Sequence, residues 1–240
     1  MTRGAKQFVY GFVYLFIFGL LLYRMFGGSG AASESGLPAA QDKAIPIAVQ
    51  EPIQLFKSSD LSRIILLAGI SNKNAEYGAR KLDYTFTLYD GNGARVDQVR
   101  GSDAIFPGES KFLLSSYEGT SYNIGRASRA DLSLSPEWVP RSVLLEPHLA
   151  VDGRPTTTVA SDGIKVEGSI RNTSPLSTGT VKVTVLLYNT YDDPVFGGQT
   201  LLERIGSLSS VPFSVYIPPD PALVGRIDGS RTRVFVSAEE

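Results

Sequence analysis

The chain repeats itself after about 99 residues, and this repeat limits the possible folds more than any other feature. Four pairs of segments match in the same order: residues 51–52 with 146–147, Gly69 with Gly168, 82–89 with 181–188, and 124–126 with 224–226. The two copies, residues 45–140 and 141–240, each have the length of an ordinary domain. The repeat therefore predicts two similar domains in tandem.

Apolar and polar residues alternate within both copies, with the period of two that is typical of β-strands. Residues 82–88 read Leu-Asp-Tyr-Thr-Phe-Thr-Leu and residues 181–187 read Val-Lys-Val-Thr-Val-Leu-Leu, so each strand is expected to have one face on a core and one in water. Further strands are predicted at residues 64–70, 110–115, 130–135, 164–170, 213–217 and 231–237. Short strands separated by Gly- and Pro-containing turns predict an all-β fold of two β-sandwiches.

A five-residue motif in the first copy resembles a known family. Residues 86–90, Phe-Thr-Leu-Tyr-Asp, resemble the F-x-L-Y-D signature of the FxLYD family of small immunoglobulin-like domains. The surrounding residues agree with that pattern: Gly69, Asn72 and residues 107–109, Pro-Gly-Glu. The second copy resembles it less closely, because it keeps Gly168, Asn172 and 187–188 but has Val185 and Asn189 at the Phe and Asp positions. The resemblance implies an immunoglobulin-like fold in a surface or membrane-anchored prokaryotic protein, and it brings no catalytic residues.

An uncharged apolar run, residues 8–23, follows two basic residues, Arg3 and Lys6, and precedes Arg24. Residues 8–26 approach the ~30 Å thickness of a hydrocarbon core, so they are predicted to be a single transmembrane signal anchor. The positive-inside rule puts residues 1–7 in the cytoplasm and both domains outside the cell membrane. A cleaved signal peptide is the alternative, since small residues follow at 27–33.

Residues 27–44 are small and polar, which indicates a flexible linker between the anchor and the first domain. Its random-coil reach is on the order of 20 to 25 Å. The chain has no cysteine, so disulfides, thiolate nucleophiles and sulfur ligands for metals are excluded.

Few residues are candidates for a catalytic or metal site. His148 is the only histidine; it aligns with Ile53 on an expected opening strand, which favours a structural role. Residues 90–93, Asp-Gly-Asn-Gly, resemble the start of a calcium loop, but Ala94 and Arg95 do not continue it, so a hairpin turn is expected. The pair Asp192 and Asp193 could bind a cation, although Asp-Asp-Pro is ordinary turn composition. We therefore assign no catalytic, cofactor-binding or metal-binding residues.

Two further residues carry a functional and a structural interpretation. Trp138, at the junction of the copies, is expected to pack between the two domains; an exposed ligand platform is the alternative. Asn172 begins a formal glycosylation sequon. Because 23 basic residues balance 24 acidic ones and the arginines are scattered, nucleic-acid binding is not expected.

These features predict a structural or interaction module rather than an enzyme. It would be held in the bilayer by residues 8–26 and present two tandem immunoglobulin-like sandwiches to protein or glycan partners, among them other envelope or membrane proteins. The alternative is an accessory subunit of a membrane transport or enzyme complex whose chemistry lies on another chain. No cofactor is expected.

Overall fold

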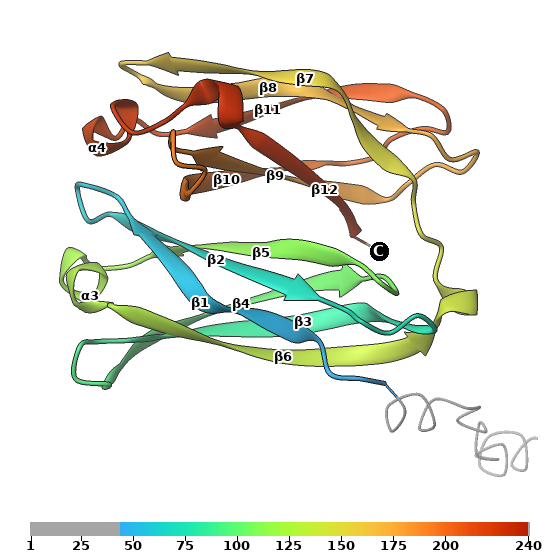
Figure 1. Ribbon diagram of the computed structural model, residues 1–240, viewed down its shortest axis with the longest axis horizontal. Helices are drawn as coiled ribbons and strands as arrows, with labels where there is room; N and C mark the ends of the chain where they lie inside the picture. Colours follow the sequence, from blue (N-terminus) through green and yellow to red (C-terminus); the bar gives the residue numbers. More distant parts are fainter. Residues whose placement is uncertain (1–43, 240) are drawn as a thin grey trace, which may run out of the picture. The chain divides into compact units, whose positions relative to one another are not determined.

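The computed structural model describes residues 44–239, which form mostly antiparallel β-strands (Figure 1). The predicted all-β fold is confirmed. The predicted cytoplasmic segment, the anchor at residues 8–26 and all of the linker except Ala44 lie outside the described residues. Between residues 44 and 239, no helix combines the length and the apolar character needed to cross a bilayer.

The first half of the chain forms two three-stranded sheets that face each other, with strand orders β1-β2-β5 and β4-β3-β6. The strands are β1 (Ala48–Lys57), β2 (Arg63–Ser71), β3 (Tyr77–Tyr89), β4 (Arg95–Ile105), β5 (Ser110–Glu118) and β6 (Arg129–Pro140). A short helix, α3 (Ser121–Arg126), precedes β6. We call these two sheets the first sandwich.

The second half forms two more sheets, with orders β11-β8-β7 and β10-β9-β12, which we call the second sandwich. Its strands are β7 (Leu149–Ala160), β8 (Gly163–Asn172), β9 (Thr180–Tyr188), β10 (Pro194–Leu202), β11 (Ser210–Ile217) and β12 (Arg233–Glu239). The remaining elements are the short helix α4 (Pro221–Val224) and two 3-10 turns, η2 (Arg141–Val143) and η3 (Gly229–Arg231).

The strand orders of the two sandwiches coincide when β1 to β6 are matched with β7 to β12. The aligned runs 82–89 and 181–188 lie on β3 and β9, the central strands of matching sheets. The match of residues 51–52 with 146–147 is wrong, because 51–52 lie within β1 whereas 146–147 precede β7. The match of Gly69 with Gly168 is one residue out of register. Gly69 on β2 pairs with Gln50 on β1, and the residue of β8 at the equivalent position, paired with Asp152 on β7, is Ser169.

Strand β3 follows the predicted alternation. Its inward side chains, at positions 82, 84, 86 and 88, are buried, and those between them are exposed or half-buried. Phe86 is fully buried in the core of the first sandwich and meets Tyr84 edge to face, with ring centroids 5.8 Å apart. Phe86 and Leu88 of the Phe-Thr-Leu-Tyr-Asp motif thus belong to the core that holds the two sheets of this sandwich together.

The two sandwiches pack against each other through sheets β1-β2-β5 and β10-β9-β12. On β2, Ile64 and Leu66 join the core of the first sandwich, whereas Ile65 and Leu67 join the core cluster of the second. Aromatic pairs cross the same interface: Phe56 with Phe196, 6.5 Å between centroids, and Phe112 with Phe235, 4.9 Å. Strand β2 is therefore buried on both faces, which accounts for its almost uninterrupted apolar sequence.

The interface also contains a buried group of charges. Asp103 on β4 lies 2.7 Å from the Nζ atom of Lys111 on β5 and 3.1 Å from the Nζ atom of Lys182 on β9. The three side chains are at most a tenth exposed. Because Lys182 comes from the second sandwich, this carboxylate joins the two sandwiches as well as two strands of the first.

The predicted alternation fails on β9. Lys182 and Thr184 were expected in water, but they are 8% and 4% exposed. The reason is the first sandwich, which covers the face of β9 that carries them, so that Lys182 reaches Asp103.

Trp138 also differs from its prediction. It lies on β6 opposite Ala79, is buried, and belongs to the core of the first sandwich rather than to the contact between sandwiches. Its closeness to the junction in sequence was misleading, because β6 runs through the far sheet of the first sandwich before the chain crosses to the second.

Candidate functional site

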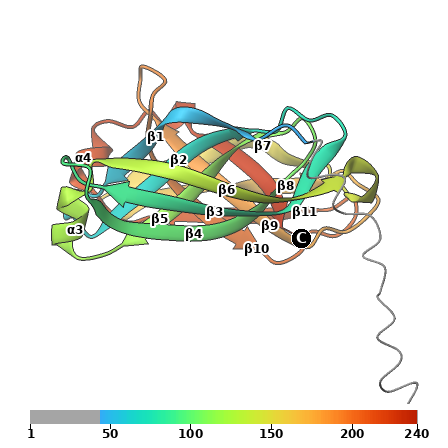
Figure 2. The same cartoon turned by 90° about the horizontal axis from the view of Figure 1, so that it is seen from below.

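Helices α3 and α4 and the β9–β10 hairpin lie at one end of both sandwiches (Figures 1 and 2). Three exposed tyrosines belong to this end of the molecule. Tyr122 on α3 is 68% exposed, Tyr191 in the hairpin 85%, and Tyr216 near the end of β11 57%. We call this the tyrosine end. Tyrosine offers a large apolar ring and a hydroxyl at a low cost in conformational entropy, and for that reason it is common in binding surfaces.

The tyrosine end rests on two matching hairpin turns. In the first sandwich, the Asp90 Oδ1 atom accepts hydrogen bonds from the backbone N–H groups of Asn92 and Ala94, both at 2.9 Å. In the second, the Asn189 Oδ1 atom accepts from Tyr191 and Asp193 at 2.9 and 3.0 Å. The expected hairpin at residues 90–93 is confirmed, and Asn189 makes the same turn without the charge.

In the first sandwich, the charge of Asp90 pairs with Arg126 at the end of α3. The Arg126 guanidinium also lies over the ring of Tyr122, 5.2 Å from its centroid. On the neighbouring strand Arg129 covers Tyr89, the tyrosine of the motif, at 4.9 Å. Asp90 and Arg126 thereby fix the base from which Tyr122 projects.

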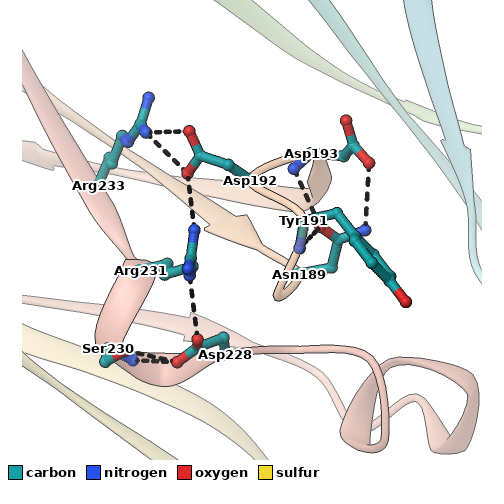
Figure 3. A network of polar contacts seen from close by, with 8 residues as sticks. All are labelled: Asn189, Tyr191, Asp192, Asp193, Asp228, Ser230, Arg231 and Arg233. Carbon is teal, nitrogen blue, oxygen red and sulfur yellow. Dashed lines mark hydrogen bonds and ion pairs between the residues drawn. The ribbon is translucent and has the colours of Figure 1, made fainter.

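In the second sandwich, the turn residue is the uncharged Asn189, and the carboxylate that pairs with arginine is Asp192, three residues further along the chain (Figure 3). Arg233 binds both carboxylate oxygens of Asp192, at 2.6 and 2.8 Å, and lies 4.4 Å from the ring centroid of Tyr188. Arg231 bridges Asp192 and Asp228, at 3.7 and 3.2 Å. The side chain of Tyr191 points away from these ion pairs (Figure 3).

This network argues against a cation site at Asp192 and Asp193. Two arginines already neutralise Asp192, and Asp193 bonds Asn189 through its backbone N–H and, at 3.4 Å, its carboxylate. Over residues 44–239, no three His, Cys, Asp or Glu side chains come together in a way that could hold a metal ion. The ion pairs instead hold the loop that presents Tyr191.

Both networks lower carboxylate pKa values. The hydrogen bond from Arg126, with those from the Ala94 and Asn92 backbone, holds the pKa of Asp90 below its ordinary 3.8. Hydrogen bonds from the Ser230 hydroxyl and backbone, with Arg231, do the same for the pKa of Asp228. The contribution of these two carboxylates to the free energy of unfolding is therefore fully present above pH 3.8. It is lost as the pH falls below 3.8 and passes through their lowered pKa values in the folded state.

We expect the free energy of unfolding to fall as the pH drops below 3.8, and to fall less steeply in the double variant Asp90→Asn, Asp228→Asn. Asparagine is a suitable replacement at position 90 because Asn189 makes the same turn. Urea unfolding of both proteins at several pH values measures the slopes. Equal slopes would show that these carboxylates do not carry the acid sensitivity.

His148 lies at the opposite end, before β7, and not on an opening strand as predicted. It is exposed and helps to line a groove of about 630 Å³ between the inter-sandwich connection, residues 144–148, and the β8–β9 loop, residues 174–180. Its backbone carbonyl accepts hydrogen bonds from the N–H and hydroxyl of Thr173. Its backbone therefore holds one wall of the groove.

The Asn172 sequon has a structural role. The side chain is fully buried, and its Nδ2 atom donates to the carbonyls of Leu176 at 2.7 Å and Gly206 at 3.1 Å. Asn72 makes the matching bonds in the first sandwich, to Tyr77 and Phe106. A glycan on this nitrogen would require the loop to unfold, so the folded domain is not a substrate for N-glycosylation.

Sequence reasoning did not identify the exposed tyrosines or their arginine partners. The sequence held one signal for them, namely a tyrosine close to a charged residue in each segment. Tyr122 lies four residues before Arg126, and Tyr191 directly precedes Asp192. The pairing of Asp192 with Arg233 spans 41 residues and depends on the fold.

No family model and no curated protein matches the chain. Similar solved structures include a red sea bream transglutaminase (10% identity, TM-score 0.25) and the tandem CBM22-1-CBM22-2 domains of Paenibacillus barcinonensis Xyn10C (9%, TM-score 0.17). A Bacteroides uniformis β-glucuronidase is a third, at 8% identity and a TM-score of 0.22. The alignment with the transglutaminase covers 87% of this chain and 34% of that chain, so this chain spans about a third of the transglutaminase. The alignment with the CBM22 tandem covers 83% of this chain and 88% of that chain, and the alignment with the β-glucuronidase covers 81% and 32%. At these scores the likeness carries no argument about function.

Proposed function

We propose that the protein is a non-catalytic interaction module that is anchored in the cell membrane by residues 8–26, with its N-terminus in the cytoplasm. In this proposal, residues 45–140 and 141–240 are two immunoglobulin-like, FxLYD-type domains outside the membrane, and they bind protein or glycan partners. The apolar run and the basic residues before it support the anchor and its orientation. The sequence motif at residues 86–90 supports the domain type.

The observation that carries the proposal is the tyrosine end. Tyr122 and Tyr191 are exposed by 68% and 85%, yet each projects from a turn or helix that an ion pair fixes. Tyrosine and arginine are enriched in protein-binding surfaces, and here exposed tyrosine rings lie on a base that arginine side chains hold in place. A protein partner, such as another envelope or membrane protein, is therefore the occupant that we favour.

The alternative, an accessory subunit of a membrane transport or enzyme complex, uses the same surface. The partner would then be the chain that carries the chemistry, and the tyrosine end would dock on it. The two cases differ in the identity of the partner and not in the residues that bind it.

Site-specific cross-linking in living cells tests the proposal. A photoreactive phenylalanine analogue at position 122 or 191 of the full chain is expected to give a discrete protein adduct. The same analogue at Ser133 or Thr156, which are exposed within strands β6 and β7 of the outer sheets, is the matched control. Alanine at the other tyrosine should weaken the adduct, because both rings would contact one partner.

Adducts no stronger at the tyrosine positions than at the two control positions would contradict the assignment of this surface. Thermal unfolding of each variant serves as a check on folding. Since both tyrosine side chains are mostly exposed, their replacement is expected to change stability by no more than about 0.5 kcal/mol.

A further inference from the structure

The end of the molecule opposite the tyrosine end carries exposed side chains of a different kind. Among the described residues, six aliphatic side chains are more than half exposed: Ile45, Val143, Leu145, Leu176, Leu201 and Leu208, at 55 to 74%. At the tyrosine end, no aliphatic side chain between residues 44 and 238 is more than half exposed; the most exposed are Val159 at 39% and Val224 at 48%. The described part of the chain is therefore aliphatic at one end and aromatic at the other.

Strand register places the six side chains at one end. Ala48 pairs with Ser71 and Leu149 with Asn172, so the segments before β1 and β7 lie beside the loops that follow β2 and β8. Leu202 pairs with Val181 at the start of β9. Hydrogen bonds join the loops to each other: Ile45 to Asn74, Arg141 to Glu76 and Leu208 to Ser174. We call this the aliphatic end.

The aliphatic end is hollowed and has balanced charge. The groove of about 630 Å³ opens there, with Leu145 and Leu176 among the residues that line it. Three basic residues, Lys73, Arg141 and Arg204, and three acidic ones, Glu76, Glu146 and Glu203, are exposed in the same loops. Contact with this end would therefore depend on apolar burial and not on charge.

The position of the first described residue, Ala44, indicates which surface lies against the aliphatic end. Ala44, the first described residue, is adjacent to Ile45 at this end. Only residues 27–43 separate it from the predicted anchor, and a linker of that composition reaches on the order of 20 to 25 Å. A bilayer that holds residues 8–26 would thus lie within reach of the aliphatic end, whereas the tyrosine end is a full strand length further away.

We propose that the aliphatic end rests on the lipid bilayer and inserts Val143, Leu145 and Leu176 among the headgroups and upper acyl chains. This inference rests on the proposed anchor and adds a second, non-covalent contact with the membrane. The contact orients the two sandwiches, so that the tyrosine end faces away from the membrane toward partners.

Fluorescence quenching in the reconstituted full chain tests this inference. The chain has no cysteine, so Leu145→Cys or Leu176→Cys can be labelled specifically with an environment-sensitive fluorophore. In phosphatidylcholine vesicles that contain a lipid with a nitroxide near the top of its acyl chain, both positions are expected to be quenched several-fold more than Tyr191→Cys. Quenching should persist in about 1 M salt, where the Debye length is ~3 Å and charge attraction is screened.

A background variant sharpens the test. With the fluorophore at Val143→Cys, the changes Leu145→Ser and Leu176→Ser are expected to reduce quenching at least twofold. All these side chains are exposed, so an unchanged thermal transition should confirm that the fold persists.

Flotation of the same vesicles separates the two possible failures. If the chain floats with the vesicles but Leu145 is quenched no more than Tyr191, the anchor stands and the bilayer contact is overturned. Cross-linking of position 145 to a second copy or to another protein, without quenching, would overturn it in favour of a protein partner. If the chain does not float, the proposed anchor fails and this inference fails with it.

Discussion

Replacing Phe86 with alanine is expected to destabilise the protein by about 3 to 5 kcal/mol. The ring is fully buried and contacts Tyr84 edge to face, so its removal loses apolar burial and leaves a cavity between the sheets of the first sandwich. Urea unfolding monitored by circular dichroism gives the value, and lower abundance in cells should accompany it. Thr87→Ala, at the next position on the outer face of β3, is the matched control. It should change stability by less than about 1 kcal/mol.

A loss for Phe86→Ala no larger than that for Thr87→Ala would contradict the core role of the motif. The comparison is direct because both residues lie on β3 and make the same ladder contacts with β4 and β6. Their side chains point to opposite faces of the sheet, Phe86 into the core and Thr87 away from it.

The second large effect is expected for Asp103→Ala, at about 3 to 5 kcal/mol. The change leaves the ammonium groups of Lys111 and Lys182 buried without the carboxylate that both contact at 2.7 and 3.1 Å. Because Lys182 belongs to the second sandwich, the loss should weaken the contact between sandwiches as well as the first sandwich itself. Glu137→Ala removes an exposed ion pair with Arg80 and should cost at most about 1 kcal/mol.

A double-mutant cycle separates the contribution of the interface. The double variant Asp103→Ala, Lys182→Met should lose less free energy of unfolding than the sum of the two single variants. The reason is that Lys182→Met removes one of the two buried ammonium groups that contact the Asp103 carboxylate. Additive losses would show that Asp103 and Lys182 are not coupled, and the contact between sandwiches would then depend on apolar packing alone.

The sequence was sufficient to predict the all-β fold and most strands. On β3, for example, apolar and polar residues alternate because one face of its sheet packs on the core and the other faces water. The same alternation on β9 was misinterpreted. Lys182 and Thr184 look like solvent-facing residues, but the first sandwich covers them, and no local pattern indicates a partner such as Asp103, which lies 79 residues from Lys182 in the chain. The near-continuous apolar sequence of β2 was the one local sign of that contact.

The candidate site was less predictable for a related reason. Asp90 was correctly assigned to a turn, since the hydrogen bonds that form this turn stay within four residues. The partners of Asp192 and the burial of Asn172 depend on loops that meet only after folding. Side chains whose partners are local could be interpreted from sequence, and those whose partners come from another strand could not.

The central claim is that both sandwiches lie outside a membrane that residues 8–26 span, with the N-terminus inside. Single-cysteine variants of the full chain test it most directly, because no native cysteine competes for the reagent. A membrane-impermeant maleimide added to intact spheroplasts is expected to label Tyr191→Cys at once and Thr2→Cys only after lysis. Labelling of Thr2→Cys in intact spheroplasts, protection of Tyr191→Cys, or a mature protein that begins near Ala31 would contradict the account.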